Sequence, residues 1–534
     1  MRFRKPEMLL LLICVFLAFC LRLYRLDGHE IWGDEAYSIT IAGWPLARAV
    51  SGNVDTHPPL YYALLWITVR VIGTSPFAVR FPSTLAGLIV VPLMYRLGRA
   101  LDRRTGLIAA ILTAISPFLI YYSQEARMYA LSLAGATGSI LAFWMLWQRQ
   151  QNSQPISPGL WGLYALASLA AIYSHYYAFA VLLAEATFLV VMAAKSRKPS
   201  YLAPWLVLWL GMALCFLPWL LEHRRFLQGK ASARFSEWSL TKFGEIAART
   251  LLACAVGKTL PPEIRPWGWG IVGIGGVGII NMAVRKHGQM LLFHSFVLLT
   301  ALVFAWAVNP LMPFFEERYL LICTPPFLLL VAAGLPGKKS RYLWSGLGML
   351  AILSLNGISF WHYHFDPAFR KGEYGSLMAG IANQGRAGDL ILLNNPLQAS
   401  LFEYYHPEGI PYRFIPPGAL LTDEETERFF SEAIAGYRRV WLVDFGNPQE
   451  YDPIHRARAW LARHAYLGLR RDYLGATLSL FILEAPAQIT HPMNVQLGDE
   501  IRLRGYSLET DIGHPGESLL VTLYWEALRP TSRS

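Results

Sequence analysis

The first residues that could do chemistry are an acidic pair, Asp34 and Glu35, which stand between aromatic residues in the segment 27–38. Neighbouring side chains point in different directions, so the sequence predicts one reactive carboxylate, Asp34, and a second, Glu35, that orients it. A positioned carboxylate can act as a general base. The alternative is structural: Asp34 caps a helix and Glu35 lies in its first turn, where negative charge is favoured.

Other segments carry residue types that bind anions and sugars. The candidate binding residues are His57, Arg127, Tyr129, His175, Tyr176, Arg318 and Tyr319, and Glu125 is a second catalytic candidate. An Arg suits phosphate because its guanidinium donates two parallel hydrogen bonds. Two prolines after His57 would hold that residue in one place. Each residue also has a structural explanation by itself; Arg127, for example, could extend to the membrane surface and pair with Glu125.

Cysteine and metal-ligand spacing exclude two other kinds of site. Four of the five cysteines fall inside apolar runs, so the sequence supports neither a disulfide framework nor a CxxC metal site. No cluster of His, Asp and Glu has strong ligand spacing. We therefore expect no obligatory metal, with a divalent cation at Asp34 and Glu125 as the alternative.

Long apolar runs must position these residues. Of 534 residues 54% are apolar and 16% charged, against roughly 25% charged in soluble domains, which indicates a polytopic α-helical membrane protein. About eleven runs approach the length that crosses a bilayer: 8–23, 77–97, 106–122, 130–147, 160–173, 178–194, 201–221, 267–284, 290–308, 319–335 and 342–360. No small-residue cleavage site follows the first run, which favours a membrane helix over a signal peptide. The run 61–72 is too short to cross and predicts an interfacial or re-entrant helix.

The positive charge sets orientation. Lys and Arg outnumber Asp and Glu by 47 − 36 = 11, and in the membrane region they cluster at alternate ends of the runs. The side of the membrane that carries these clusters is predicted to be cytoplasmic, and the N-terminus lies on it. The positive charge is then explained by topology and no longer supports a nucleic-acid partner. The candidate residues then share the outer side of the plasma (inner) membrane with everything after residue 360. Five outer turns with acids, Arg, His and Tyr at one depth predict a cavity at the outer face.

The C-terminal third has ordinary charge density and short elements. Helices are predicted at 376–383 and 423–437, strands at 389–394 and 438–444, and a hairpin at 465–483. We therefore expect an outer α/β domain over 361–488. The strands 500–506 and 518–525 are too few for an independent sheet, so 489–534 is interpreted as the start of a β-sandwich domain that is apparently incomplete.

These motifs together resemble a known family. The matching segments are Trp32-Gly-Asp-Glu-Ala-Tyr37, His57-Pro-Pro-Leu-Tyr-Tyr62, Arg80-Phe-Pro-Ser83, Tyr122-Ser-Gln-Glu-Ala-Arg-Met-Tyr129, His175-Tyr-Tyr177 and Arg318-Tyr319 with Pro325-Pro326. Over about residues 5–360 the chain resembles GT-C superfamily membrane glycosyltransferases of the protein-mannosyltransferase (glycosyltransferase family 39, RgtA-B-C-D-like) and lipid A aminoarabinose-transferase type. The resemblance implies a GT-C transmembrane domain, 1–360.

The resemblance also implies an activity. Such enzymes move a sugar, a hexose such as mannose or a modified pentose, from a polyprenyl-phosphate donor to a glycan, lipid or protein acceptor at the outer face. Asp34 and Glu125 match acidic positions of the family. One base and a phosphate leaving group make an inverting single displacement the simplest scheme, whereas a nucleophilic carboxylate would give retention.

Two other classes of protein remain as alternatives. A transporter or lipid flippase would place paired charges near the bilayer midplane, often in two related halves. The clearest ionisable residue inside a run is Glu185, which we expect to be hydrogen-bonded within the helix bundle, and no internal repeat is found. The second alternative is a non-catalytic scaffold protein. The acidic residues between the first two apolar runs argue against it.

Overall fold

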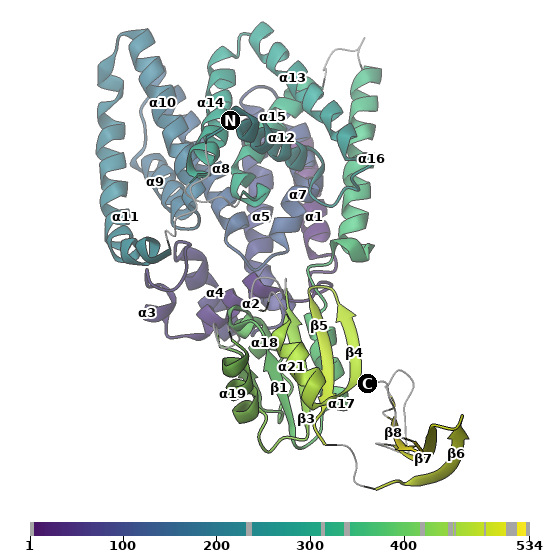
Figure 1. Cartoon of the computed structure of the whole chain (residues 1–534). Helices are drawn as coiled ribbons and strands as arrows, with labels where there is room; N and C mark the ends of the chain where they lie inside the picture. Colours follow the sequence, from purple (N-terminus) through teal and green to yellow (C-terminus); the bar gives the residue numbers. More distant parts are fainter. Residues whose placement is uncertain are drawn as a thin grey trace. The chain divides into compact units, whose positions relative to one another are not determined.

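The computed structural model describes residues 5–230, 238–310, 315–335, 342–416, 422–446, 452, 455–484, 488–508, 519 and 521–529. The chain forms two compact units (Figure 1). The first contains residues 1–29 and 37–369, and the second contains residues 30–36 and 370–534. The short segment that carries Asp34 and Glu35 is thus counted with the C-terminal unit. The predicted boundary at residue 360 falls within a helix that continues to Phe365.

The first unit is a bundle of long apolar helices. The described residues include nine helices that are long and apolar enough to cross a membrane, or ten if one bent pair is a single span. Their principal helices are α1 (Lys5–Leu23), α5 (Pro76–Arg99), α8 (Tyr129–Gln151), α10 (Phe179–Ser196), α11 (Ala203–Lys230), α13 (Gly268–Val284), α14 (Gly288–Val308), α15 (Thr324–Gly334) and α16 (Tyr342–Phe365). The bent pair is α6 (Arg103–Ile115) and α7 (Pro117–Ser123), and the predicted run 160–173 is the shorter α9 (Pro158–Ile172). The predicted polytopic helical fold is confirmed.

The break between α6 and α7 has a local cause. Ser116 precedes Pro117, which disfavours helical backbone at Ser116, and the two helices meet at 54°. The buried Arg22 of α1 donates hydrogen bonds to the carbonyls of Thr113 (3.1 Å) and Ala114 (3.1 Å), two acceptors near the break. In return the Arg22 carbonyl accepts a hydrogen bond from Gln124 Nε2 (2.9 Å), so α1 is also tied to the turn after α7, where Glu125 and Arg127 lie.

Further helices lie between the long apolar ones along the chain. The first outer loop, between α1 and α5, contains α2 (Gly33–Gly43), α3 (Leu46–Ala49) and α4 (Leu60–Val71). The predicted short helix at 61–72 corresponds to α4. A further helix, α12 (Leu240–Val256), lies between the predicted runs 201–221 and 267–284. The turns η1 (Tyr176–Ala178) and η4 (Glu317–Cys323) precede α10 and α15.

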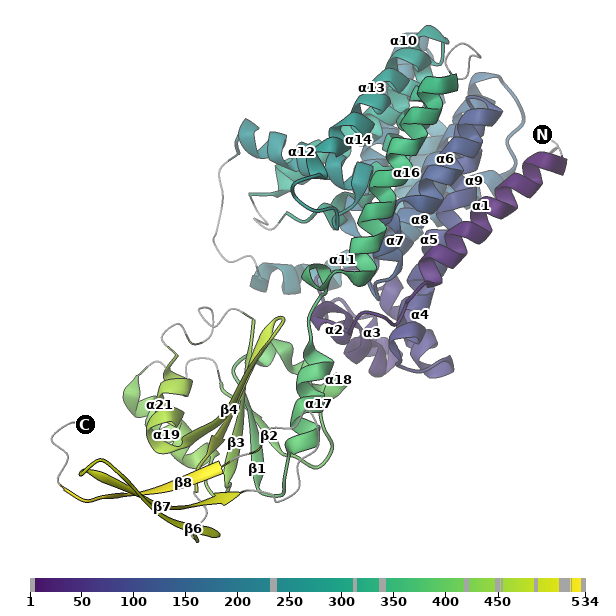
Figure 2. The ribbon, with the colours of Figure 1, turned by 90° about the vertical axis from the view of Figure 1, so that its right-hand side faces the viewer.

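The second unit contains a mixed five-stranded sheet of order β2-β1-β3-β5-β4. Its strands are β1 (Asp389–Leu393), β2 (Tyr412–Phe414), β3 (Arg439–Phe445), β4 (Tyr466–Tyr473) and β5 (Ala476–Ile482). β1 pairs in parallel with β2 and β3, whereas β5 runs antiparallel to β3 and β4. Helices α17 (Tyr374–Gln384) and α18 (Ala399–Tyr405) lie on one side of the sheet, and α19 (Asp423–Ala433) and α21 (Arg456–His464) on the other (Figure 2).

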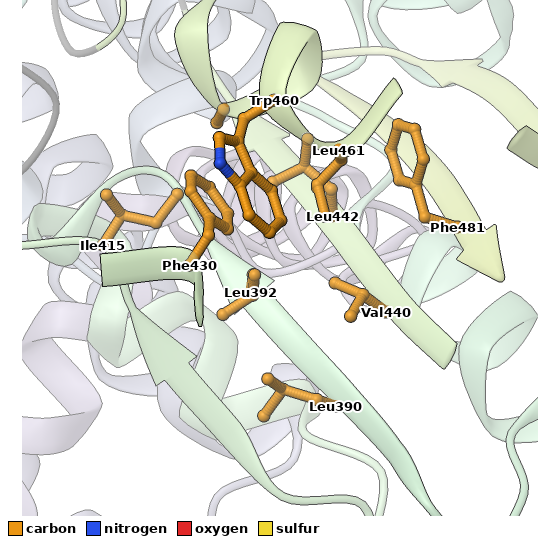
Figure 3. Close-up of a cluster of buried hydrophobic side chains, with 10 residues drawn as sticks. Leu390, Leu392, Ile415, Phe430, Val440, Leu442, Trp460, Leu461 and Phe481 are labelled. Carbon is orange, nitrogen blue, oxygen red and sulfur yellow. The ribbon is translucent and has the colours of Figure 1, made fainter. Parts of the chain in front are cut away.

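Apolar packing holds α19 and α21 on this sheet. Leu390 and Leu392 of β1 face the same cluster as Val440 and Leu442 of β3, as expected for alternate residues of neighbouring strands (Figure 3). Above them the rings of Phe430 from α19 and Trp460 from α21 stack with centroids 4.8 Å apart. With Phe481 of β5, the cluster joins three strands and two helices into one core. The remaining strands, β6 (His491–Leu497), β7 (Ile501–Leu508) and β8 (Val521–Ala527), form a separate three-stranded sheet.

A buried ion pair in the five-stranded sheet gives a stability prediction. Asp389 accepts hydrogen bonds from Arg439 Nε (2.7 Å), Arg439 Nη2 (2.7 Å) and Trp441 Nε1 (2.8 Å), and both charged side chains are buried. Asp389→Asn should lower the free energy of unfolding of this unit by about 3 kcal/mol, because it leaves the Arg439 charge uncompensated. Denaturant unfolding of the full chain, followed by Trp fluorescence, measures this loss.

The exposed Arg470, 3.9 Å from Asp472, offers a matched control. Arg470→Gln should change the free energy of unfolding by less than about 0.5 kcal/mol, since exposed pairs contribute little. Equal losses in the two variants would contradict the burial argument.

Candidate functional site

The site begins in the first outer loop with an acid and a histidine two residues apart. Asp55 Oδ1 accepts a hydrogen bond from the backbone N–H of Thr56 (2.7 Å), which fixes the carboxylate locally. Its other oxygen, Oδ2, lies 3.1 Å from His57 Nδ1. Pro58 and Pro59 then lead into α4, whose first N–H, that of Leu60, donates to the carbonyl of Tyr173 (3.0 Å). The loop is therefore anchored close to the turn that carries His175.

Arg127 joins this pair to two other helices. Its Nη1 donates to Ser38 Oγ of α2 (3.0 Å) and lies 3.4 Å from Tyr62 Oη of α4, and the Tyr62 hydroxyl donates to Asp55 Oδ2. The Arg127 carbonyl accepts from Ser83 Oγ of α5 at 3.1 Å. Arg127 is 4% exposed. The geometry places a buried guanidinium within one hydrogen-bonded chain with Asp55 and His57.

His175 lies at the centre of an aromatic group. Its ring centroid is 5.5 Å from those of His57 and Tyr129, and 5.6 Å from that of Tyr319. The Arg318 guanidinium carbon is 5.6 Å from the centroid of the Tyr129 ring. Six of the predicted residues thus come together within the first unit, from four separate segments: His57, Arg127, Tyr129, His175, Arg318 and Tyr319. They supply two guanidinium cations and two imidazoles, a set suited to an anionic group.

The predicted acids lie in three different settings. Asp34 is partly exposed and Glu35 fully buried, both in the first turn of α2, which starts at Gly33. Asp34 is one helical turn from Ser38, the residue that contacts Arg127, so the two lie on the same face of α2. Glu125 is 1% exposed, and its carbonyl accepts the backbone N–H of Arg127 (2.8 Å). The catalytic roles of Asp34, Glu35 and Glu125 stay predictions.

Two residues have other surroundings. Tyr176 packs against α11, with ring centroids 5.9 Å from Trp219 and 6.1 Å from His223. Glu185 is fully buried, and its carboxyl group is hydrogen-bonded to Tyr164 Oη (2.7 Å) and Ser139 Oγ (2.9 Å). Glu185 therefore links α10 to α8 and α9, as the sequence predicts.

Asp55 and Tyr62 are site residues that the sequence did not single out. Burial by itself would raise the pKa of Asp55, but the charge and hydrogen bond of His57, with Arg127 and Tyr62, hold the pKa well below its usual range. Asp55 is therefore a carboxylate at neutral pH. Burial raises the pKa of Tyr62 well above its usual value, so its hydroxyl keeps its proton and donates a hydrogen bond to Asp55. The spacing Asp-x-His was the available signal.

His175 gives a pH prediction. Its Nδ1 accepts the backbone N–H of Tyr177 at 3.3 Å, which requires an unprotonated Nδ1. Burial lowers the pKa of His175 well below its usual value, and the positive charges of His57, Arg127 and Arg318 lower it further. Below about pH 6.5 the unfolded chain therefore binds a proton that the folded chain does not, so stability falls as the pH falls.

The unfolding temperature in detergent, measured from pH 7.5 to pH 5, should consequently fall less steeply for His175→Gln than for the unchanged protein. Leu397→Gln, at an exposed position of the second unit, serves as a control that should keep the original slope. Identical slopes in all three proteins would show that His175 is not the group responsible.

Possible metal ligands are the last feature of the site. Among the residues that the structure describes, no group of three or more His, Cys, Asp or Glu side chains could hold a metal ion. The absence of an obligatory metal and the alternative cation at Asp34 and Glu125 both stay predictions.

Solved structures of similar fold are known. ArnT from Cupriavidus metallidurans bound to undecaprenyl phosphate is 13% identical with a TM-score of 0.60, and 88% of this chain covers 97% of that one. The apo state of the same protein gives 13% identity, a TM-score of 0.59 and the same coverage. The oligosaccharyltransferase of Archaeoglobus fulgidus tethered with an acceptor peptide gives 13% identity and a TM-score of 0.54, with 88% of this chain covering 73% of that one. The chain therefore shares the fold of these membrane proteins.

A family model adds evidence from sequence. The family described as dolichyl-phosphate-mannose-protein mannosyltransferase matches residues 56–221, which include His57, Arg127 and His175. No curated protein matches the chain in sequence. The resemblance inferred from the motifs is confirmed, at the level of the GT-C glycosyltransferases.

Proposed function

We propose that this protein transfers a sugar from a polyprenyl-phosphate donor to an acceptor at the outer face of the membrane. The observation that carries the proposal is the convergence of Arg127, Arg318, His57 and His175 beside Tyr129. The phosphate of a lipid-linked donor fits such a group. The undecaprenyl phosphate bound by the ArnT of similar fold supports this class of donor.

The proposed reaction is a single displacement at the anomeric carbon. Asp34 takes the proton of the acceptor hydroxyl, whose oxygen forms the new bond to carbon. The bond from carbon to the phosphate oxygen breaks, its electron pair stays on the phosphate, and Arg127 and Arg318 stabilise that negative charge. The configuration is inverted, and turnover needs no metal. The sugar is a hexose or a modified pentose, and the acceptor is a glycan, a lipid or a protein.

Purified protein incubated with a radiolabelled polyprenyl-phosphate sugar should move the label to an acceptor and release polyprenyl phosphate. Panels of mannose and aminoarabinose donors, each offered with lipid, glycan and peptide acceptors, identify the substrates. Added chelator should leave the rate unchanged. Transport of an intact lipid-linked sugar across vesicles without bond cleavage would instead support the transporter alternative.

The proposed orientation puts the N-terminus in the cytoplasm and the second unit outside. Leu397, in the second unit, is 79% exposed and suits a reporter cysteine. A membrane-impermeant maleimide should label Leu397→Cys in intact cells. Labelling only after the membrane is opened would reverse the orientation.

A further inference from the structure

The helix α12 lies against the segment that leads into α15. Ser239 caps its start, because the Ser239 Oγ accepts the N–H of Lys242 (3.1 Å). The helix ends at Gly257, where φ is +77° and an added Cβ would lie 3.0 Å from Pro117, so a glycine is required. Cys254 Sγ lies 3.5 Å from the Oγ1 of Thr324, the first residue of α15. Both the start and the end of α12 are therefore well defined.

Two cations from α12 and its C-terminal end contact the residues just before Arg318. Arg249 Nε donates to Glu317 Oε1 (2.9 Å), and Lys258 Nζ lies 3.1 Å from Glu316 Oε2 and 3.4 Å from Glu317 Oε2. The Glu317 side chain is only 5% exposed. Arg249 also lies over the Phe315 ring, 5.1 Å from its centroid. The side chains of Arg249 and Lys258 thus hold three consecutive residues, 315–317.

This network decides the charge next to the proposed donor site. Glu317 begins η4, and Arg318 and Tyr319 follow it directly. Two uncompensated carboxylates beside Arg318 would lower the positive potential that attracts a phosphate. Arg249 and Lys258 offset those two negative charges. The same contacts fix the backbone from which Arg318 extends towards Tyr129.

We propose that Arg249 and Lys258 are positioning residues, which hold Arg318 in place and neutralise Glu316 and Glu317, so that the site binds the phosphate of a lipid donor. The inference rests on the proposed function for the identity of the bound anion. A purely structural network would only attach α12 to the bundle, and would not be sensitive to which charge is removed.

The test is a charge-rescue series with undecaprenyl phosphate in detergent as the probe. Lys258→Met should weaken its binding about five- to tenfold, because one negative charge near the phosphate is no longer offset. The double variant Lys258→Met with Glu316→Gln should restore binding to within about twofold, since it removes that charge as well. Arg249→Met, alone and with Glu317→Gln, repeats the design at the more buried pair.

Lys242→Met is the matched control. Lys242 lies on the same helix and forms an ion pair of 2.9 Å with Glu245, which Arg249 also contacts at 3.3 Å. Its replacement leaves Arg249, Lys258 and both carboxylates beside Arg318 in place. Its replacement should leave binding unchanged. Weakened binding that the double variants fail to restore, or equal weakening in Lys242→Met, would overturn the electrostatic role.

A second measurement separates this inference from the proposed function. Amide hydrogen exchange over 317–323 should be faster in Arg249→Met and Lys258→Met than in Lys242→Met, without any ligand. An unchanged protein that fails to bind undecaprenyl phosphate would overturn the proposed donor, and the exchange rates would then still decide the positioning role. Unchanged exchange in all variants would overturn that role.

Discussion

Asp34→Asn is expected to lower the rate of sugar transfer by about 10³-fold, within the range of 10²–10⁴ that general acid–base catalysis contributes. An amide has nearly the same shape as the carboxylate but cannot accept the acceptor's proton at neutral pH. Asp34 is partly exposed in the first turn of α2. Turnover of the labelled donor, measured with the unfolding temperature, separates lost chemistry from lost folding.

The exposed Asp27 of the same loop provides the control. Asp27→Asn removes one negative charge there and should leave turnover within about twofold, because a solvated surface charge is screened. Wild-type turnover in Asp34→Asn would exclude Asp34 as the base. Glu125→Gln would then be the next variant to measure, since Glu125 lies two residues from Arg127.

Replacement of Arg127 is expected to have the second large effect. Arg127→Met removes the hydrogen bond to Ser38 and a cation close to Asp55. If Arg127 stabilises the departing phosphate, kcat/KM for the donor should fall by about 10²–10³-fold, as for the loss of one preorganised donor at a developing negative charge. Separate kcat and KM values for the donor and for the acceptor show whether the loss of kcat/KM lies in kcat or in KM, and for which substrate.

Arg127→Lys keeps the charge but loses the planar fork, so it should retain more activity than Arg127→Met. This variant also guards against misfolding, since a cation remains near Asp55. A donor kcat/KM that is unchanged in both variants would remove Arg127 from the phosphate site and leave it a structural role between α2 and α4.

Local properties explain why much of the fold could be predicted. Each of the eleven predicted runs corresponds to helix, because length and hydropathy are read from consecutive residues. The strands β1 and β3 were predicted for the same reason, as short buried apolar runs. The helix α12 was missed because its charged residues, Arg249 among them, interrupt the apolar pattern. The carboxylate that holds Arg249 against the bundle, Glu317, lies on another segment.

The candidate site was only partly predictable. Residue type indicated His57, Arg127, His175 and Arg318, since imidazole and guanidinium side chains near a membrane surface have few common uses. Asp55 was passed over because a carboxylate in a loop is usually solvated. Its importance comes from the burial and charges around it, which involve Arg127, a residue far along the chain.

The sequence by itself determined the approximate limits of the apolar runs, the α/β character of the C-terminal part and the residue types available for phosphate chemistry. Of the eleven predicted runs, nine or ten are long enough to cross a membrane among the described residues. Only the tertiary structure decided which of the candidate residues meet. Arg127 is 89 residues from Ser38 and 65 from Tyr62, and Arg249 is 68 residues from Glu317. Such contacts depend on how helices pack, and helix packing is set by the whole bundle and not by neighbouring residues in the chain.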